Sequence, residues 1–317
     1  MGACDGNFVS DKSKVIFSVT DFRNKKIEFS KPVERVVCLI ESGLSGLYML
    51  KVEDKIVGIP SDVYLTKVNK FYSKLDKRIE TKQLATPGNW DFVNIEQVVA
   101  LKPDLVIIWA SQNEIISNLE NFKIPVYAVM INSFDDVYKE MSDFGKIFNS
   151  TERADSLIHF TKNNLNEISK NNTQKNKKRV YFMWSQGINE TSGKNSTVNE
   201  LLTFAGTQNV CEMEQEHISV NIEKIIEWQP EMIVMWNNEK LNSIDIINNS
   251  QLKDIQAIKT KNVYELPNVF NCDFWTLKMQ YPIKLISNWA NENTVNFDEK
   301  TELNNLYKTL YGKSIVE

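Results

Sequence analysis

The chain has 317 residues, of which 42% are hydrophobic and 25% charged, so it is long enough for two lobes that each bury a core. Its formal net charge is -4 and its isoelectric point is about 5.5, and no segment supplies the basic face that phosphate backbones require, which excludes nucleic acid as a partner. No run of about 18 uninterrupted apolar residues occurs, so no membrane-spanning helix is predicted.

Small residues precede a cysteine at the beginning of the sequence, where Gly2 and Ala3 are followed by Cys4 and then by a polar stretch. This pattern is similar to the end of a lipoprotein signal, in which the cysteine becomes the acylated N-terminus. A chance cysteine in a disordered end is the alternative interpretation. We therefore expect residues 1–13 to form a tether and Cys4 to carry a lipid anchor to the membrane.

The first part of the chain alternates between apolar runs and helical stretches. Residues 15–22 and 27–29 flank a polar Asn-Lys-Lys turn, which predicts an N-terminal β-hairpin. A short helix is expected at 44–50, and another ends near residue 101. Because alternating strands and helices are typical of parallel sheets, residues 14–133 are expected to form an N-terminal α/β lobe. Four apolar runs predict its buried strands, at 36–40, 56–59, 105–109 and 126–130.

The next segment predicts one long helix. No proline occurs from Asp135 to about Lys170, and apolar residues recur there at helical spacing. This spacing fits a single amphipathic helix of about 35 residues, longer than most globular helices. With the polar linker that follows, residues 134–174 are expected to form a bridge. A second alternating region, 175–317, then forms the C-terminal α/β lobe and ends in a helix near 301–310.

An internal repeat indicates that the two lobes are similar. Residues from Asn94 to Trp109 align without gaps on those from Asn221 to Trp236. Both copies begin Asn-Ile-Glu, reach a proline followed by an acidic residue, and end in an apolar run and a tryptophan. The predicted fold class is therefore α/β, with two parallel-sheet α/β lobes bridged by one long α-helix.

Candidate binding residues stand at the carboxyl ends of the predicted strands, because ligands of open α/β sheets bind in the crevice beyond those ends. Five of the seven tryptophans fall there or on two loops that lead to the same edge. Large flat side chains suit a ligand with flat or greasy faces, such as a catechol, a porphyrin or a corrin, although any single tryptophan can simply cap the core. The candidate ligand-binding residues are Glu41, Ser42, Trp90, Trp109, Trp184, Ser185, His217, Trp236, Phe270 and Trp275.

His217 is one of two histidines, and extending the repeat upstream makes it the counterpart of Trp90. An imidazole can complete the coordination of a chelated metal that keeps an open position, so His217 is the candidate metal ligand, acting through a chelate. A solvated histidine beside the acidic stretch 212–216 is the alternative.

Catalytic motifs are absent from the sequence, which has no GxSxG, no HExxH and no glycine-rich phosphate loop with lysine. A metal-cluster-binding enzyme component remains the alternative from another class, and it would need cysteines placed to ligate a cluster. We expect no catalysis and no resident cofactor. Three further cysteines lack CxxC or zinc-ligand spacing and are interpreted as free thiols: Cys38, Cys211 and Cys272.

Several motifs together resemble the periplasmic-binding-protein family for iron complexes and vitamin B12, whose members are binding components of bacterial ABC importers. The resemblance covers nearly the whole chain, from about residue 15 to residue 312. The motifs that carry it are KPVERVV at 31–37, DKIVGI at 54–59, NIE at 94–96 with PDLVI at 103–107, NELL at 199–202 with AG at 205–206, and KNVYELP at 261–267.

The resemblance implies that the lobes hold ligand between them, move little on binding, and deliver the ligand to an ABC permease dimer. In the family, an acidic residue on each lobe meets arginines of the permease. Glu96 and Glu223, the matched glutamates of the repeat, stand at those positions. A first-turn glutamate that merely stabilises its helix is the alternative.

The expected ligand is an iron complex, a ferric siderophore or haem, with cobalamin or another corrinoid as the alternative. Family members that hold tris-catecholate iron commonly present several arginines, whereas most of the five arginines here lie away from the predicted rim. A highly charged siderophore is therefore less favoured. The protein is expected outside the cytoplasm, lipid-anchored to the cell membrane or periplasmic.

Overall fold

The computed structural model describes residues 15–171, 177–238, 240–291 and 297–316. Cys4 and the tether expected over residues 1–13 lie outside these ranges. Within them, no helix is both long enough and apolar enough to cross a membrane.

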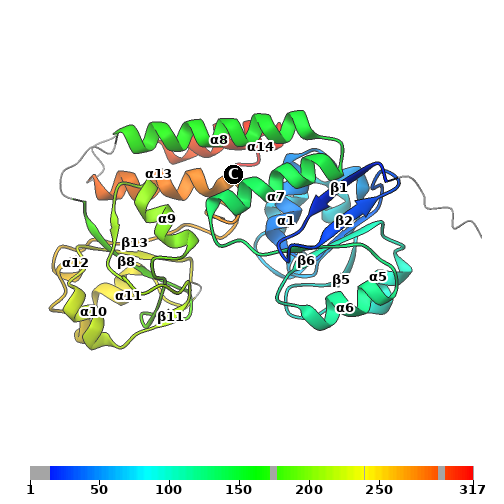
Figure 1. Cartoon of the computed structure of the whole chain (residues 1–317). Coiled ribbons are helices and arrows are strands. Elements are labelled where there is room, and N and C mark those ends of the chain that lie inside the picture. Colours follow the sequence, from blue (N-terminus) through cyan, green and yellow to red (C-terminus); the bar gives the residue numbers. More distant parts are fainter. Residues whose placement is uncertain (1–14, 172–176, 239, 292–296, 317) are drawn as a thin grey trace, which may run out of the picture.

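A five-stranded parallel sheet with strand order β5-β4-β3-β6-β7 forms the N-terminal lobe (Figure 1). Its central strands are apolar and buried, as expected where helices cover both faces of a parallel sheet. All four strands predicted here are confirmed, and β5 is an additional one. The strands are β3 (Val36–Cys38), β4 (Ile56–Pro60), β5 (Ala85–Gly88), β6 (Leu105–Trp109) and β7 (Val126–Val129). The helices are α1 (Glu41–Met49), η1 (Glu53–Lys55), α2 (Asp62–Leu65), α3 (Asn69–Leu75), α4 (Lys77–Glu80), α5 (Ile95–Ala100) and α6 (Asn113–Asn121).

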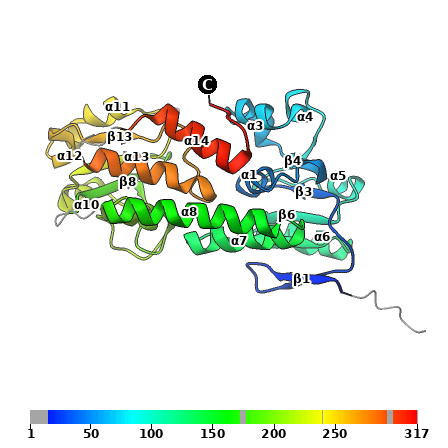
Figure 2. The same ribbon diagram turned by 90° about the horizontal axis from the view of Figure 1, so that it is seen from above.

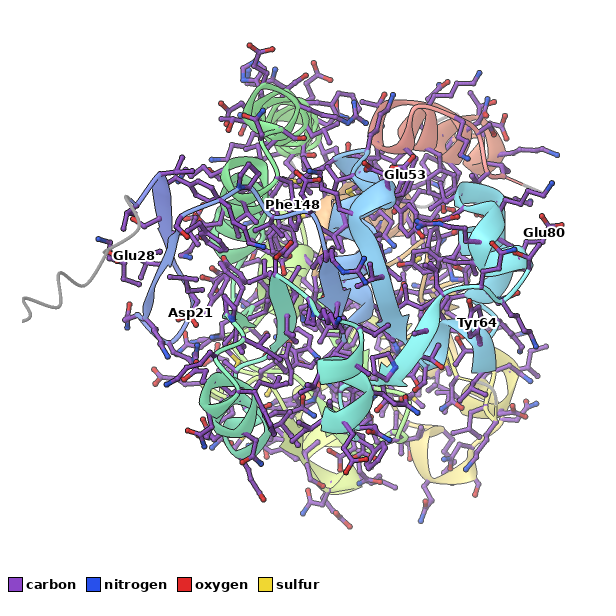
Figure 3. The ribbon with its side chains drawn as sticks, turned by 90° about the vertical axis from the view of Figure 1, so that its right-hand side faces the viewer. Asp21, Glu28, Glu53, Tyr64, Glu80 and Phe148 are labelled. Carbon is purple, nitrogen blue, oxygen red and sulfur yellow. The ribbon has the colours of Figure 1, made fainter. Side chains whose placement is uncertain are left out.

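The predicted N-terminal hairpin is confirmed as antiparallel strands β1 (Phe17–Thr20) and β2 (Lys26–Phe29). Asn24 takes the left-handed conformation in the turn, with φ of 62°. Figure 3 shows Asp21 and Glu28 of this hairpin on one side of the N-terminal lobe, opposite the helices that carry Tyr64 and Glu80.

A four-stranded parallel sheet with order β10-β8-β12-β13 forms the C-terminal lobe, so the predicted pair of α/β lobes is confirmed. A short antiparallel pair, β9 and β11, flanks the sheet. The strands are β8 (Arg179–Met183), β9 (Glu190–Thr191), β10 (Gln208–Asn209), β11 (Ile218–Ser219), β12 (Met232–Met235) and β13 (Val263–Glu265). The helices are α9 (Thr197–Phe204), α10 (Ile222–Trp228), α11 (Ser243–Ile247), η2 (Ser250–Leu252), α12 (Gln256–Lys259), η3 (Leu277–Met279), α13 (Gln280–Ala290) and α14 (Glu299–Tyr311).

The prediction of one continuous helix of about 35 residues is wrong, because the segment forms two helices, α7 (Phe134–Ile147) and α8 (Thr151–Asn171). Asn149 ends the first helix in the left-handed conformation, with φ of 55°. Gly145 lets the two helices approach closely, since a Cβ there would lie 2.7 Å from the Cβ of Ala154. The 21-residue α8 is therefore the helix that runs between the lobes (Figure 1).

Helices α13 and α14 lie beside α8 and make a second connection between the lobes (Figure 2). At the end of α14, the Tyr311 hydroxyl shares a 2.7 Å hydrogen bond with Ser45 Oγ of α1. Arg153 of α8 donates to the Leu310 carbonyl at 2.8 Å. The end of α14 thus contacts the N-terminal lobe, and the boundaries at residues 133 and 174 stay a prediction.

The internal repeat has matched local structure. Asn94 and Asn221 cap α5 and α10, each accepting a hydrogen bond from the backbone N–H three residues later. Lys102 and Gln229, each just before a proline, are left-handed with φ of 48° and 44°. Matched positions therefore start and end the helix of this helix–strand unit in both lobes.

Candidate ligand-binding site

A cavity of about 160 Å³ lies where the carboxyl ends of the two sheets meet, and both lobes contribute to its lining. From the N-terminal lobe come the β3–α1 junction, the start of α2, the loop after β5 and the end of β6. From the C-terminal lobe come the residue after β12 and the loop between β13 and η3. The lining residues are Leu39, Ile40, Glu41, Ser42, Asp62, Trp90, Trp109, Trp236, Val269, Asp273 and Trp275.

The β3–α1 junction places Glu41 and Ser42 in the first turn of α1, directly after extended Ile40. Gly43 fits this tight turn because a Cβ there would come within 3.1 Å of Ile40 and 3.2 Å of the sulfur of Cys38. Ser42 is 7% exposed, and its Oγ has no hydrogen-bond partner among the described residues. An oxygen that lines a cavity without a partner is available to a ligand.

The Glu41 carboxyl accepts a 2.9 Å hydrogen bond from the Tyr72 hydroxyl. Burial raises the pKa of Glu41 to about 7, the charge of Lys278 opposes this rise, and the charge of Asp273 adds to it. The carboxyl therefore changes its charge near neutral pH, at the edge of the cavity.

Asp273 forms an ion pair with Lys278, whose Nζ lies 3.5 Å from the Asp273 carboxylate. The Lys278 side chain is fully buried, and its Nζ lies 3.8 Å from the ring centroid of Phe270. Burial by itself lowers the pKa of Lys278, but the neighbouring Tyr311, Asp273 and Glu41 outweigh it and raise that pKa. We conclude that Lys278 is a charged ammonium beneath the cavity.

Aromatic rings pack in a continuous group on the C-terminal side of the cavity. The centroids of Trp236 and Trp275 are 5.7 Å apart, and Phe274 lies 5.0 Å and 4.6 Å from them, respectively. Behind them, Trp184 is parallel to Trp275 within 6° at 6.1 Å. Such packing holds the indoles that line the cavity in place without a ligand.

Six of the ten candidate residues line the cavity: Glu41, Ser42, Trp90, Trp109, Trp236 and Trp275. The other four lie nearby. Trp184 is buried behind Trp275, and its Nε1 donates to Ser192 Oγ at 2.9 Å. His217 is exposed, with its ring 4.9 Å from that of Trp184.

Ser185 is exposed, and its carbonyl accepts a 2.6 Å hydrogen bond from Asn238. Phe270 is fully buried and stacks on Phe71 at 4.4 Å, so it belongs to the core below the cavity. Packing across the lobes, and not position in the chain, turns Phe270 away from the lining.

Sequence reasoning missed two carboxyl residues of the lining, Asp62 and Asp273. Asp62 follows the carboxyl end of β4, so the strand-end rule that selected Glu41 could have found it. Asp273 stands in the aromatic loop that contains the candidate residues Phe270 and Trp275. Its charge in this apolar loop was the signal that could have identified it as a lining residue.

Exposed Glu96 and Glu223 each occupy the second position of a short helix, in α5 and α10, as the repeat predicts. The three free cysteines predicted from spacing are confirmed as buried free thiols: Cys38, Cys211 and Cys272. No group of three or more potential metal ligands of the His, Cys, Asp or Glu type occurs in the part of the chain that the structure describes.

Two α/β lobes with a cavity where the carboxyl ends of both sheets meet are the arrangement of a solute-binding protein. A family model described as periplasmic binding protein matches residues 36–269, and the chain belongs to this family. It is a substrate-binding protein of the type that serves ABC importers.

Relatives of known sequence and structure agree with this family. An uncharacterized ABC transporter substrate-binding lipoprotein of Bacillus subtilis is 27% identical over 262 residues, 79% of each chain. A vitamin B12-binding protein of Vibrio parahaemolyticus is 23% identical over 75% of this chain and 82% of its own. The molybdate-bound periplasmic binding protein of Haemophilus influenzae is 21% identical, with a TM-score of 0.80 over 94% of this chain and 98% of its own, and shares the fold.

Proposed function

We propose that the cavity between the lobes binds a metal chelate, first of all an iron complex such as a ferric siderophore or haem, for delivery to an ABC permease dimer. The observation that carries this proposal is the set of four indoles that line the cavity, Trp90, Trp109, Trp236 and Trp275. Flat apolar walls with a few polar groups suit a ligand that has flat or greasy faces of its own.

The size of the cavity favours a ligand that is only partly enclosed. A volume of about 160 Å³ is below the roughly 300–1,000 Å³ of pockets that bury drug-sized ligands. Trp90 and Phe92, 60% and 67% exposed, extend the apolar surface beyond the cavity on the N-terminal side. We infer that a chelate enters with one face and rests its remainder on this rim.

A corrinoid is the second candidate, because a relative that covers most of this chain is a vitamin B12-binding protein. A corrinoid is larger than the cavity, as haem is, so it too would be only partly enclosed. A metal-cluster-binding enzyme component is not favoured, because the three described cysteines are buried and none lines the cavity.

His217 remains the candidate metal ligand. Because it is exposed and touches Trp184, it would reach a chelate only at the outer edge of the site. The variant His217→Ala tests this role: a shifted or lost metal-to-ligand absorption band supports coordination, and an unaltered spectrum of the bound chelate opposes it.

The proposed function is tested on protein purified from its native host. Absorbance spectroscopy followed by mass spectrometry identifies any chromophore that purifies with the protein. An iron chelate or a corrinoid there, bound with one molecule per chain and quenching tryptophan emission, supports the proposal. A ligand without metal would contradict it.

A further inference from the structure

The charged side chains that line the cavity are all acidic. Three of its lining side chains carry carboxyl groups, and none is a lysine, an arginine or a histidine: the carboxyls belong to Glu41, Asp62 and Asp273. A cation lies beneath them, Lys278, whose side chain is fully buried and paired with Asp273. One ammonium opposes three carboxyl groups, so the lining is negative when all three are ionised.

None of the arginines among the described residues offsets this excess of carboxyl groups at the cavity. Arg23 pairs with Asp21 and Arg78 with Asp76, both outside the cavity. Arg35 donates to the Leu101 carbonyl at 2.7 Å, and Arg153 to the Leu310 carbonyl. Arg179 begins β8, at the end of the strand opposite to the cavity. An anionic ligand would therefore meet carboxylates without a guanidinium to hold it.

The same acids stand among tryptophan faces. A cation over an indole is attracted to the negative face of the ring, and tryptophan is the aromatic residue that does this best. Four indoles line one cavity here, and Trp236 and Trp275 are fixed by packing against Phe274. Aromatic faces combined with carboxylates are what the recognition of ammonium groups requires.

Two oxygens at the cavity also lack hydrogen bonds from the described residues. They are Ser42 Oγ, in a residue that is 7% exposed, and Asp273 Oδ2, in a residue that is 4% exposed. Lys278 Nζ lies 3.5 Å from Asp273 Oδ2, at the long end of an ionic contact, and this Nζ likewise has no closer hydrogen-bond partner among the described residues. Buried polar atoms of this kind find partners, and both oxygens can accept from an N–H donor.

We propose that the cavity selects ligands that carry positive charge, with the cationic group placed between the carboxyls of the N-terminal lobe and the indoles. This inference rests on the proposed function and narrows its ligand class to chelates with a cationic group. It predicts discrimination against trianionic tris-catecholate complexes and against oxyanions. The Asp62 carboxylate, which already accepts a 2.8 Å hydrogen bond from Asn89, is held at the cavity by that contact.

A pair of probes that differ only in charge tests the proposal. The iron(III) complex of desferrioxamine B carries a pendant ammonium, and acetylation of that amine gives a neutral complex of the same shape. We expect the cationic complex to bind at least about 10-fold more tightly, measured by titration calorimetry and tryptophan quenching. Equal affinity, or tighter binding of a tris-catecholate iron(III) complex or of molybdate, would overturn the inference while leaving a chelate-binding function intact.

An organic cation that contains no metal tests the cation site separately from metal-chelate binding. If phenyltrimethylammonium binds and displaces the cationic iron complex, the cation site is confirmed within the chelate site. If it binds and neither iron complex does, charge selection holds and the metal-chelate function fails. Binding of no cationic probe would overturn the inference.

Matched variants identify which carboxyl group causes the preference for cationic ligands. Asp62→Asn keeps the shape of the side chain and is expected to reduce the preference for the cationic over the acetylated complex several-fold. Glu41→Gln is the second variant and tests the same preference. Asp91→Asn is the control, because Asp91 is exposed next to Trp90 but does not line the cavity. An unchanged preference in both lining variants, each with wild-type thermal stability, would overturn the assignment.

Discussion

Lys278 and Asp273 form an ion pair of 3.5 Å in which the lysine side chain is fully buried and the aspartate side chain 6% exposed. The pair joins the start of η3 to the loop that carries Trp275, so a buried charge supports the wall of the cavity. Removing one partner of such a pair leaves the other charge without compensation, whereas replacing both is far less costly.

The first prediction concerns this pair. Lys278→Met is expected to lower the free energy of unfolding by about 3–5 kcal/mol in urea titrations, because Asp273 and Glu41 lose their buried cation. Adding Asp273→Asn should restore part of the loss. Lys284→Met is the control, since Lys284 pairs with Glu302 in a partly exposed position and should cost less than about 1 kcal/mol. A loss no larger than that of the control would refute the buried-charge role.

The second prediction concerns the indole walls. Trp275→Ala is expected to weaken chelate binding by about 1–3 kcal/mol, because an aromatic contact in the cavity is lost. Trp184→Ala should weaken binding as well and should also lower stability, since this ring is buried behind Trp275. The matched control is Trp289→Ala, whose ring stacks on Tyr264 at 4.8 Å outside the cavity. Calorimetry that shows equal affinities for all three variants would remove the tryptophans from the site.

The third prediction concerns pH and Glu140 of α7. Burial raises the pKa of Glu140 from about 4.5 to about 8, Asp273 adds to the rise, and Lys139 opposes it. The folded protein then keeps a proton that the unfolded chain releases, so stability falls as the pH rises from about 4.5 to about 8. Glu140→Gln stays neutral and should be more stable than wild type at pH 8.5, by roughly 1–3 kcal/mol, and similar at pH 4.

Chemical denaturation at several pH values measures the slope of the free energy of unfolding against pH. Glu41, with a pKa of about 7, contributes with the same sign, as do Asp273, Glu200 and Glu216, whose pKa values burial also raises, so part of the slope is expected to remain in Glu140→Gln. Glu152→Gln, an exposed first-turn acid of α8, is the control and should keep the wild-type slope. An identical slope in Glu140→Gln and wild type would show that Glu140 ionises freely.

The fourth prediction concerns transport. Glu96 and Glu223 are exposed at matched positions of the two lobes, as docking to a two-fold permease would require. The double variant Glu96→Ala with Glu223→Ala should keep ligand affinity and thermal stability but sharply reduce uptake in reconstituted vesicles. Glu114→Ala with Glu227→Ala removes two other exposed helix acids and serves as the control. Uptake at the wild-type rate by the docking variant would exclude the role.

The fifth prediction concerns anchoring through Cys4. Stable attachment needs more than one acyl chain, so mass spectrometry of protein made with its native leader should show a multiply acylated cysteine. Cys4→Ser should release the protein from the membrane fraction. An unmodified Cys4 in membrane-bound protein would contradict the lipoprotein assignment.

The sequence by itself determined the two lobes, because helix caps, prolines that follow helices and apolar runs are local signals. The internal repeat contains these signals once in each lobe. It also predicted the four tryptophans that line the cavity, since Trp109 ends β6 and Trp236 follows β12, and the carboxyl ends of both strands face the cavity. The continuous helix predicted over residues 135–170 is instead interrupted at Asn149, whose left-handed conformation the apolar period of the segment does not reveal, while α8 alone runs between the lobes.

Only the tertiary structure decided which loop residues line the cavity. Phe270 and Asp273 stand three positions apart on one loop, yet the first packs on Phe71 of the other lobe and the second lines the cavity. The burial of Lys278 and its distance to Asp273 likewise depend on how η3 meets the N-terminal lobe. Periodicity cannot predict such choices, because they are made by contacts between segments that are far apart in the chain and meet only in the folded state.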